Sequence, residues 1–399
     1  MSYLAPSKRA ARASSNLLRS ASRAAAGASN SFAGQQRVNK IHASSKDKAV
    51  HATTQPAGLG AGLPEFMTAG MTPVSTPTTA TPTSTLPRVP AGQLNVLEQS
   101  RKPEFYQAIS KIMAIRKDYV EKRFVWVPAE EMIDICLGLG ATREDLEALP
   151  QTADGLQYDP TLPFRKTRNG RFCFDYDTQS VRRLEFQPFA LSAEEDFKRY
   201  DSGQIRRFDE IDDELQLNTV LQALLVFKGM VVHGVEMAHR PKLDYDVNKN
   251  ILTLFHLRTT TNQEILGEPA LEGIHSDGVD HTMTTLLGHR NMRADSAVTF
   301  MHAMHEQTGI PLNDAKPENI RARVQHTKLL DTLMILDHEN KHSLSPVYQE
   351  DLTQDATRDM LVFFTRKPVE EGHISSKIDS KTPHKVKKME IPLFLPRTQ

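Results

Sequence analysis

The sequence predicts an α+β fold in which a double-sheet barrel is buttressed by N-terminal helices. Helical spacing of apolar residues dominates the first part of the folded region, up to about residue 150. From Arg171 onward, short runs with strand-like alternation prevail, and polar turns separate them. Helices followed by many short, antiparallel-looking strands are typical of a double-sheet barrel with helical support.

The helical part runs from Pro103 to about Leu149. Its apolar residues recur at near-helical spacing, and Pro128 suits the start of a second helix that Gly138 and Gly140 end. A further helix is predicted over Asp213–Lys228. The chain is therefore expected to place two helices before its strands and one among them.

The strands begin with the alternating residues Phe172, Phe174 and Tyr176, which predict a half-buried strand. Further strands are predicted near Arg183–Leu191, Ile251–Thr259, Met283–Gly288, Ser296–His302, Leu329–Leu336, His342–Val347 and Asp359–Thr365. Their number and shortness favour two packed sheets.

Three segments precede or make up the folded region. Residues 1–45 are rich in Arg, Ser and Ala and contain no acidic residue, which is typical of an organellar transit peptide. We expect a mitochondrial address, with plastid or cytoplasmic location as the alternatives. Residues 46–92 are Thr- and Pro-rich and cannot bury enough apolar surface to offset their ordering entropy, so a disordered linker is expected. One catalytic domain is expected over 93–399.

Composition narrows the classes of partner. The 49 basic and 49 acidic residues balance, so the chain has no overall attraction for nucleic acid or anionic membranes. Its two cysteines are too few for a disulfide framework or a thiolate zinc site. The longest apolar stretch, Val220–Val232, is interrupted by Gln222 and Lys228 and is shorter than the roughly 20 residues of a membrane span. We expect a small-molecule partner, no nucleic acid and no membrane span, with the oligomeric state left open.

The most informative stretch is Glu272–Gly278, which contains His275 and Asp277. In an extended strand, residues two apart point to the same face, so this pair can reach one metal ion. Gly273 and Gly278 allow sharp turns on either side. The pair supplies two corners of a two-histidine, one-carboxylate triad, which leaves the opposite face of an iron ion open. A His-x-Asp pair alone also occurs by chance in surface loops.

A second histidine must come from a later strand. Residues Leu333–Asp337 have the pattern of a buried strand, residues 338–341 that of a polar turn, and His342 begins the next strand. His338 is the competitor, but its turn position holds geometry less well than a strand does. His342 is therefore the expected third ligand.

Such a site also needs a cation if its cosubstrate is a dicarboxylate such as 2-oxoglutarate. An unpaired buried carboxylate is very costly, and a guanidinium can bind it bidentately. Arg358 opens the apolar strand Asp359–Thr365, sixteen positions after His342, and is the expected anchor. Arg366, at the other end of that strand, is the alternative.

Taken in order, these segments resemble the 2-oxoglutarate–iron(II) dioxygenase family typified by bacterial isoleucine hydroxylase, whose members act on free amino acids. The resemblance spans about Leu217 to Lys367 and rests on four ordered segments, preceded by the strand Leu252–Thr260. They are Gly273–Asp280, Leu286–Asn291, Asp337 with His342–Pro346, and Arg358–Val362.

The resemblance implies a double-stranded β-helix (jelly-roll) core and oxidation of a free amino acid, with hydroxylation as the expected outcome. Iron(II), 2-oxoglutarate and dioxygen would be required, and succinate and carbon dioxide would be coproducts. It maps the metal ligands onto His275, Asp277 and His342, and the cosubstrate anchor onto Arg358.

Departures from the family pattern lie at Ser276, His281 and the pair His289-Arg290, and they put the substrate in doubt rather than the metal site. Some fungal relatives carry out oxidative cyclisation of amino acids, so cyclisation stays open beside hydroxylation. Arg258, His281 and Asn291 are candidates for contacts to substrate or to the metal ligands, and each is also readily explained as an ordinary structural polar group.

Two other functions compete. A cupin-like metalloenzyme would share the barrel and the histidines without using 2-oxoglutarate, but such sites usually open with His-x-His. A non-catalytic barrel-fold binding protein would be favoured by a missing triad member, and all three candidates are present.

Overall fold

The computed structural model describes residues 93–195 and 198–395. The predicted transit-like segment, residues 1–45, and the predicted linker, residues 46–92, lie outside these described residues, so both stay predictions. Among the described helices, none is long and apolar enough to cross a membrane.

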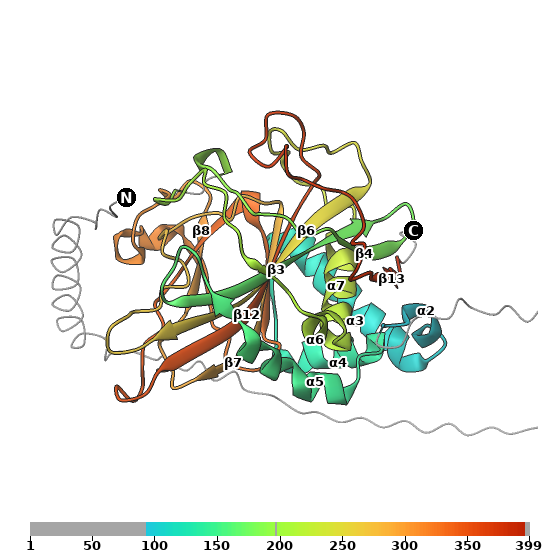
Figure 1. Cartoon of the computed structure of the whole chain (residues 1–399), viewed down its shortest axis with the longest axis horizontal. Coiled ribbons are helices and arrows are strands. Elements are labelled where there is room, and N and C mark those ends of the chain that lie inside the picture. The colour runs from blue at the N-terminus through green and yellow to red at the C-terminus, as the bar shows by residue number, and fades with distance from the viewer. Residues whose placement is uncertain (1–92, 196–197, 396–399) are drawn as a thin grey trace, which may run out of the picture. The chain divides into compact units, whose positions relative to one another are not determined.

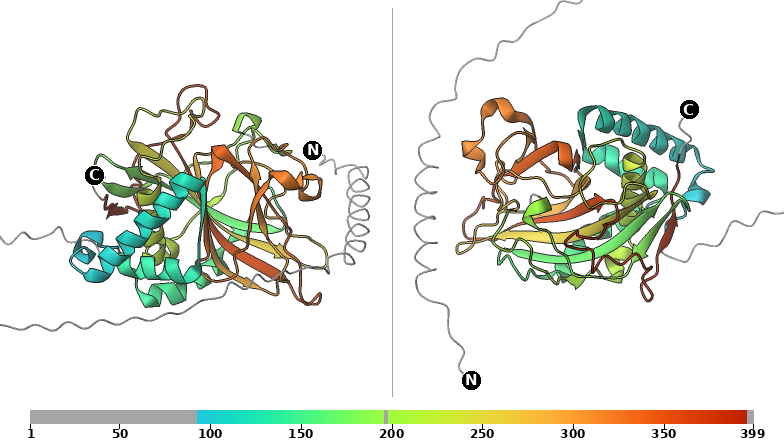
Figure 2. Two further views of the ribbon diagram at one scale, coloured as in Figure 1. Left: turned by 180° about the vertical axis from the view of Figure 1, so that it is seen from behind. Right: turned by 90° about the horizontal axis from the view of Figure 1, so that it is seen from above.

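The helices gather against the larger of two sheets (Figures 1 and 2). Their bounds are α2 Val96–Gln99, α3 Pro103–Lys122, α4 Ala129–Leu139, α5 Arg143–Ala148, α6 Asp213–Gln216 and α7 Thr219–Val232. The predicted helical region after Pro103 is confirmed by α3 to α5. The prediction missed β1, Phe124–Val127, because only its pairing with β10, Thr332–Leu336, makes this short segment a strand.

The predicted helix over Asp213–Lys228 is confirmed in position but consists of two pieces. Asn218 interrupts it, and its side chain accepts hydrogen bonds from the backbone N–H groups of Val220 and Leu221, which caps α7. Every residue of α7 is buried, so this helix lies in the centre of the core rather than on its surface.

The strands form two sheets within the described residues. The major sheet has the order β1-β10-β7-β12-β6-β3-β4-β13, with β2 and β5 beside β3, and the minor sheet has the order β11-β8-β9. The remaining bounds are β2 Gln157–Tyr158, β3 Arg165–Asp175, β4 Ser180–Leu184, β5 Asp209–Glu210, β6 Lys249–Thr261, β7 His281–Arg290, β8 Thr299–Ala303, β9 Ile320–Val324, β11 Asn340–Leu344, β12 Ala356–Arg366 and β13 Glu390–Pro392. The predicted α+β class is confirmed.

Some predicted strands differ from the observed ones. The strand predicted at Arg183–Leu191 was wrong except for its first two residues, which form the end of β4. The prediction also missed β9. The strand predicted at Phe172–Tyr176 is confirmed as the end of β3, but it is not half-buried, because the intervening Cys173 is buried as well. Both faces of the major sheet are covered, so alternation in sequence does not mark one face as exposed.

The two faces of the major sheet serve different purposes. On β12, Leu361 and Phe363 join α7 in the main hydrophobic core. The alternate residues Met360, Val362 and Phe364 line a cavity between the sheets. On the cavity side, Met301 of β8 packs with Leu333 and Ile335 of β10, which closes the minor sheet over the major one.

A buried lysine fastens the central helix to the sheet. Lys228 of α7 donates hydrogen bonds from Nζ to the backbone oxygens of His281 on β7, at 3.1 Å, and Phe363 on β12, at 2.7 Å. Burial holds the pKa of this ammonium well below its ordinary value, and the charges of Asp277 and Asp337 oppose that effect. The contact fixes α7 behind the two strands that support the cavity.

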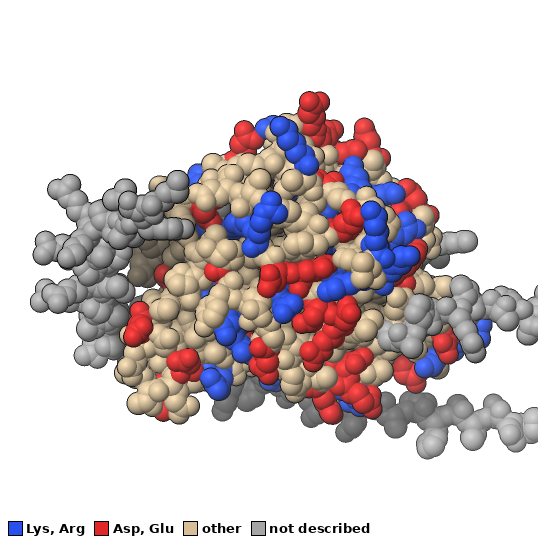
Figure 3. Space-filling view, viewed as in Figure 1, with Lys and Arg blue, Asp and Glu red and all other residues tan. Residues whose placement is uncertain are grey.

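Charged side chains on the face drawn in Figure 3 lie intermixed, with basic and acidic groups side by side. This distribution agrees with the zero formal net charge of the chain.

Candidate metal centre

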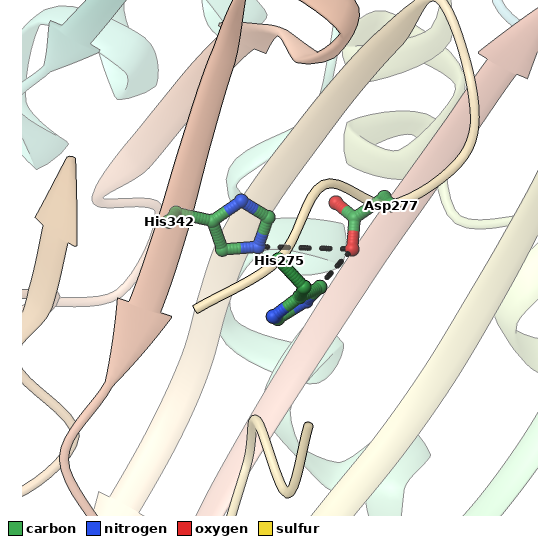
Figure 4. Close-up of side chains that lie close together, drawn as sticks. All are labelled: His275, Asp277 and His342. Atoms are coloured by element: carbon green, nitrogen blue, oxygen red, sulfur yellow. Dashed lines mark ion pairs between the residues drawn. The ribbon is translucent and has the colours of Figure 1, made fainter. Parts of the chain in front are cut away.

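His275, Asp277 and His342 come together at one point of the cavity wall (Figure 4). His275 and Asp277 lie in the connection between β6 and β7, and His342 lies within β11. The expectation that the His-x-Asp pair sits in a regular strand was wrong, because only an isolated bridge forms here. In it, His275 N donates to His342 O at 3.0 Å, and His342 N donates to His275 O at 2.8 Å.

The three side chains present suitably spaced ligand atoms. Asp277 Oδ1 lies 3.4 Å from His275 Nε2 and 3.7 Å from His342 Nε2, and one ligand atom from each residue falls within 4.8 Å of the others. Two ligands at right angles around a small divalent ion, each about 2.1 Å from it, lie about 3 Å apart. The observed spacing fits such an ion after a small inward adjustment.

Neighbouring groups orient these ligand atoms. His275 Nδ1 lies 2.9 Å from Gly273 O, a contact in which Nδ1 carries the proton and Nε2 keeps its lone pair for a metal. Thr282 Oγ1 donates to Asp277 Oδ2 at 2.7 Å, which leaves Oδ1 facing the two histidines. The arrangement prepares one nitrogen and one oxygen for the same ion.

The flanking glycines do what the sequence predicted. Gly273 and Gly278 have φ angles of 76° and 74°, a backbone conformation that residues other than glycine rarely adopt. A Cβ at Gly273 would collide with the backbone oxygen of Ile310, and one at Gly278 with that of Glu195. Close backbone packing on both sides therefore holds the loop that carries His275 and Asp277.

The electrostatics of the site favour a cation. Asp277 and the fully buried Asp337 lie close together, and within the described part of the chain neither forms an ion pair with Lys or Arg. Burial, followed by the charge of Asp277, raises the pKa of Asp337 well above its ordinary value. Burial also opposes ionisation of Asp277, but His342 and His275 outweigh it and lower its pKa. A divalent ion would relieve this concentration of carboxylates.

The cavity beside the triad has a volume of about 150 Å³. One part of its wall is apolar and aromatic, formed by Phe189, Phe255, Val362 and Phe364. Phe255 stands 4.9 Å from Phe189 and 5.5 Å from Phe364 between ring centroids. The triad thus opens onto a small, largely apolar space.

Arg358 lies in the same cavity, as its candidate role requires. It is 3% exposed, and no ion pair joins it to a carboxylate of the described residues. Burial alone lowers the pKa of its guanidinium to about 10. Arg358 lies opposite Thr259 on the neighbouring strand, and the hydroxyl oxygen of Thr259 is buried. Among the described residues, neither this oxygen nor Arg358 Nε has a hydrogen-bond partner. Both groups are suited to binding a carboxylate brought in by a ligand.

The alternatives and secondary candidates lie elsewhere. Arg366 pairs with Asp379 at 3.2 Å, and His338 lies in a one-turn 3-10 helix outside the triad. Three further candidates do not line the cavity. Arg258 pairs with Asp359, His281 Nδ1 lies 2.8 Å from the hydroxyl of Tyr119, and Asn291 donates to two backbone oxygens of a surface turn. These contacts give each of the three a structural role.

Sequence reasoning missed several polar residues of the site. It assigned no role to four of them: Asp337, Thr259, Arg206 and Glu272. Glu272 directly precedes the metal motif, and Asp337 belongs to one of the four segments that carry the family resemblance. Alternation could have placed Thr259 with the interior residues of β6. No local pattern marks Arg206, which comes from an irregular segment.

Comparison with known proteins gives three findings. A family model described as 2OG-Fe dioxygenase matches residues 151–364. The solved Fe(II)/(alpha)ketoglutarate-dependent dioxygenase TqaL is 54% identical, and the match covers 74% of this chain and 99% of that chain with a TM-score of 0.64. The bifunctional enzyme flvA of Aspergillus flavus is 45% identical over 302 residues, which make up 76% of this chain and 37% of the enzyme. The chain thus matches little more than a third of that relative.

A more distant structure shares the fold alone. The bsmA homologue from Methylobium petroleophilum PM1 is 16% identical, and the match covers 65% of this chain and 95% of that chain with a TM-score of 0.52. The two-sheet core therefore recurs where little of the sequence is retained.

Proposed function

This chain belongs to the 2OG-Fe dioxygenase family, and on that premise we propose that it oxidises a free amino acid or similarly small molecule, most simply by hydroxylation. Membership confirms the predicted double-stranded β-helix core, the enzyme class and the use of iron(II), 2-oxoglutarate and dioxygen. It also decides against the cupin-like and non-catalytic alternatives.

We propose that His275, Asp277 and His342 hold the iron(II). The observation that carries this assignment is the convergence of three ligand atoms from two distant segments, with Nε2 of both histidines directed at one carboxylate oxygen. Iron(II), with 2-oxoglutarate and dioxygen, supplies the oxidant that removes hydrogen from an unactivated carbon. The chain supplies three ligands on one side of the ion and leaves the other side to the cavity.

Arg358 is proposed to anchor the carboxylate of 2-oxoglutarate that lies far from the metal. Its buried guanidinium and the hydroxyl of Thr259 stand on neighbouring strands in the same register. A carboxylate placed there would satisfy two groups that are otherwise costly to bury. The aromatic wall formed by Phe189, Phe255 and Phe364 excludes water from the remaining space, where the substrate would lie.

The test is anaerobic titration of the protein with iron(II) and 2-oxoglutarate, recorded in the visible range. A chelated 2-oxo acid on iron(II) gives a metal-to-ligand charge-transfer band. We expect the band in the native protein, its loss in His342→Ala and its retention in the matched control His338→Ala. Iron binding without a band would refute the proposed cosubstrate site, and a band unchanged in His342→Ala would refute the ligand assignment.

A mitochondrial location is proposed from the composition of residues 1–45. Fusion of these residues to a fluorescent protein tests it, with all basic residues replaced by Gln in the control. Accumulation in mitochondria that the control lacks is the expected result, and an identical distribution of the two fusions would refute it.

A further inference from the structure

A threonine of β7 places a hydroxyl group on the cavity wall beyond the metal ligands. Thr284 lines the cavity, and its neighbour Met283 lies in the main hydrophobic core on the other face of the sheet. Thr282, two positions earlier on the cavity side, donates its hydroxyl to Asp277 at 2.7 Å. Thr284 is therefore the next hydroxyl along this face of β7, and it has no role in holding a ligand of the triad.

The strand register places Thr284 between the triad and Arg358. On β12, Val362 lies opposite Thr284, and Arg358 lies opposite His289, further along β7 from the metal motif. Val362 and Arg358 both line the cavity, as Thr284 does. A ligand that reaches from the triad to Arg358 therefore passes Thr284.

A buried histidine fixes the hydroxyl of Thr284. His326 Nε2 lies 3.1 Å from Thr284 Oγ1 and 3.2 Å from the backbone oxygen of the same residue. A carbonyl oxygen can only accept, so Nε2 carries the ring proton and directs it toward both oxygens. The hydroxyl then accepts from His326 and keeps its own proton for another acceptor. Within the described part of the chain, it has no other hydrogen-bond partner.

The ring of His326 is held rigidly and is neutral. It is 2% exposed, and Trp126 of β1 packs against it edge to face, with 4.9 Å between the ring centroids. Burial, followed by the charge of Arg358, lowers the pKa of His326 to about 3. The action of that charge also means that the guanidinium of Arg358 lies near the ring. One end of the cavity thus brings together a guanidinium, a neutral histidine and the hydroxyl that this histidine directs.

The hydroxyl of Thr284 is not required by its protein surroundings. His326 already has an acceptor for its proton in the backbone oxygen of Thr284. The cross-strand neighbours on both sides, Val362 on β12 and Leu333 on β10, are apolar. Valine has the shape of threonine and suits a strand equally well. An acceptor carried by a ligand accounts for a hydroxyl at this position.

We propose that the Thr284 hydroxyl donates a hydrogen bond to the carboxylate of 2-oxoglutarate that Arg358 anchors, and that His326 is the positioning residue that directs it. This inference rests on the proposed function and assigns two further residues to the cosubstrate. The hydroxyl and the guanidinium come from different strands, so they bind the carboxylate from two directions. A 2-oxo acid that lacks this carboxylate gains nothing from either residue, and the pair therefore helps to select a dicarboxylate.

The experiment compares 2-oxoglutarate with 2-oxopentanoate, which chelates iron(II) through the same 2-oxo acid group but lacks the second carboxylate. The Kd of each is measured under argon from the charge-transfer band. Thr284→Val should raise the Kd for 2-oxoglutarate by about 10-fold, because one charge-assisted hydrogen bond is lost, and should leave the Kd for 2-oxopentanoate unchanged. Thr285→Val is the matched control, because its hydroxyl pairs with that of Thr332 at 3.0 Å on the core side, and it should change neither Kd.

Two variants of the histidine test its positioning role. His326→Met removes the ring donor and should raise the Kd for 2-oxoglutarate by about 5-fold, again without effect on 2-oxopentanoate. His326→Gln supplies an amide N–H in place of Nε2–H and should restore most of the affinity. The double variant Thr284→Val with His326→Met should bind 2-oxoglutarate as Thr284→Val does, because the histidine acts through the hydroxyl.

The outcomes separate this inference from the proposed function. Absence of the band with both 2-oxo acids in the native protein would refute the proposed function. A normal band with an unchanged Kd for 2-oxoglutarate in Thr284→Val would overturn the inference alone, and so would equal losses for the two acids. Losses that add in the double variant would overturn the positioning role of His326.

Discussion

The carboxylate of Asp337 accepts hydrogen bonds from the backbone N–H groups of Asp277, at 2.9 Å, and of its neighbour Gly278, at 3.1 Å. Asp337 also donates its own N–H to Asp280 O at 3.0 Å. It directly follows β10 and begins the 3-10 turn that leads to β11 and His342. One buried side chain therefore ties the loop carrying Asp277 to the segment carrying the third candidate ligand.

This contact predicts that Asp337→Ala weakens iron(II) binding by about 10- to 100-fold, the usual effect of losing a group that orients a ligand. Equilibrium dialysis against iron(II) under argon measures it. The control is Asp331→Ala at the other end of β10, whose carboxylate accepts from the backbone N–H groups of Ala129 and Lys328 far from the triad. Equal losses of affinity in the two variants would contradict a positioning role for Asp337.

The metal itself should stabilise the fold. A ligand present at about 100 times its Kd adds about 2.7 kcal/mol to the free energy of unfolding, which raises Tm by several degrees. Differential scanning calorimetry under argon should show this rise with iron(II) and its reversal by a chelator. We expect His275→Ala and Asp277→Ala to remain folded and to lose the rise, and His338→Ala to keep it. Retention of the full rise in either ligand variant would exclude that residue as a ligand.

Removing the proposed anchor should affect the cosubstrate more than the metal. Arg358→Met is expected to raise the KM for 2-oxoglutarate by about 100-fold, because a bidentate charged contact is lost, and to leave iron(II) affinity unchanged. Steady-state oxygen consumption measures the KM. Arg366→Met, at the other end of β12 and paired with Asp379, is the control. If this control shows the larger change in KM, the anchor moves to Arg366.

A glycine comparison tests the loop that carries Asp277. Gly278→Ala should destabilise the protein by about 2 kcal/mol or more, because φ is positive and the new Cβ meets the backbone of Glu195. Gly288→Ala on β7 has open space around the new methyl group and should cost much less. Urea unfolding measures both. Similar losses in the free energy of unfolding for the two variants would mean that the loop adjusts to the new methyl group, and that its tight packing does not stabilise the fold.

Acid should destabilise the protein partly through His256. Burial lowers the pKa of His256 to about 4 in the folded state, from an ordinary value of 6.5. The unfolded state therefore binds the proton first, and stability is lost as the pH falls from about 6.5 to about 4, by up to about 3 kcal/mol. Urea unfolding at several pH values should show a shallower loss in His256→Gln over this window. An identical pH dependence would show that His256 does not titrate differently on folding.

Local sequence patterns were enough to predict the helices after Pro103, most strands and the fold class. These features depend on spacing within a few residues, since periods of 3.6 and 2 decide which side chains share a face. The His-x-Asp pair and its two glycines are local in the same sense. The conformation of the two glycines agrees with the prediction, and the pair does lie with His342, although on a bridged loop rather than in a strand.

The sequence by itself determined the fold class and a short list of residues able to bind iron and a dicarboxylate. Only the tertiary structure decided which side of each strand faces the cavity, because helices cover one face of the major sheet and the minor sheet closes over the other. That choice directs Thr259 and Arg358 inward, while it pairs Arg258 with Asp359 and His281 with Tyr119. It also brought in Arg206 and Asp337, whose contacts join residues distant in the chain that no local periodicity relates.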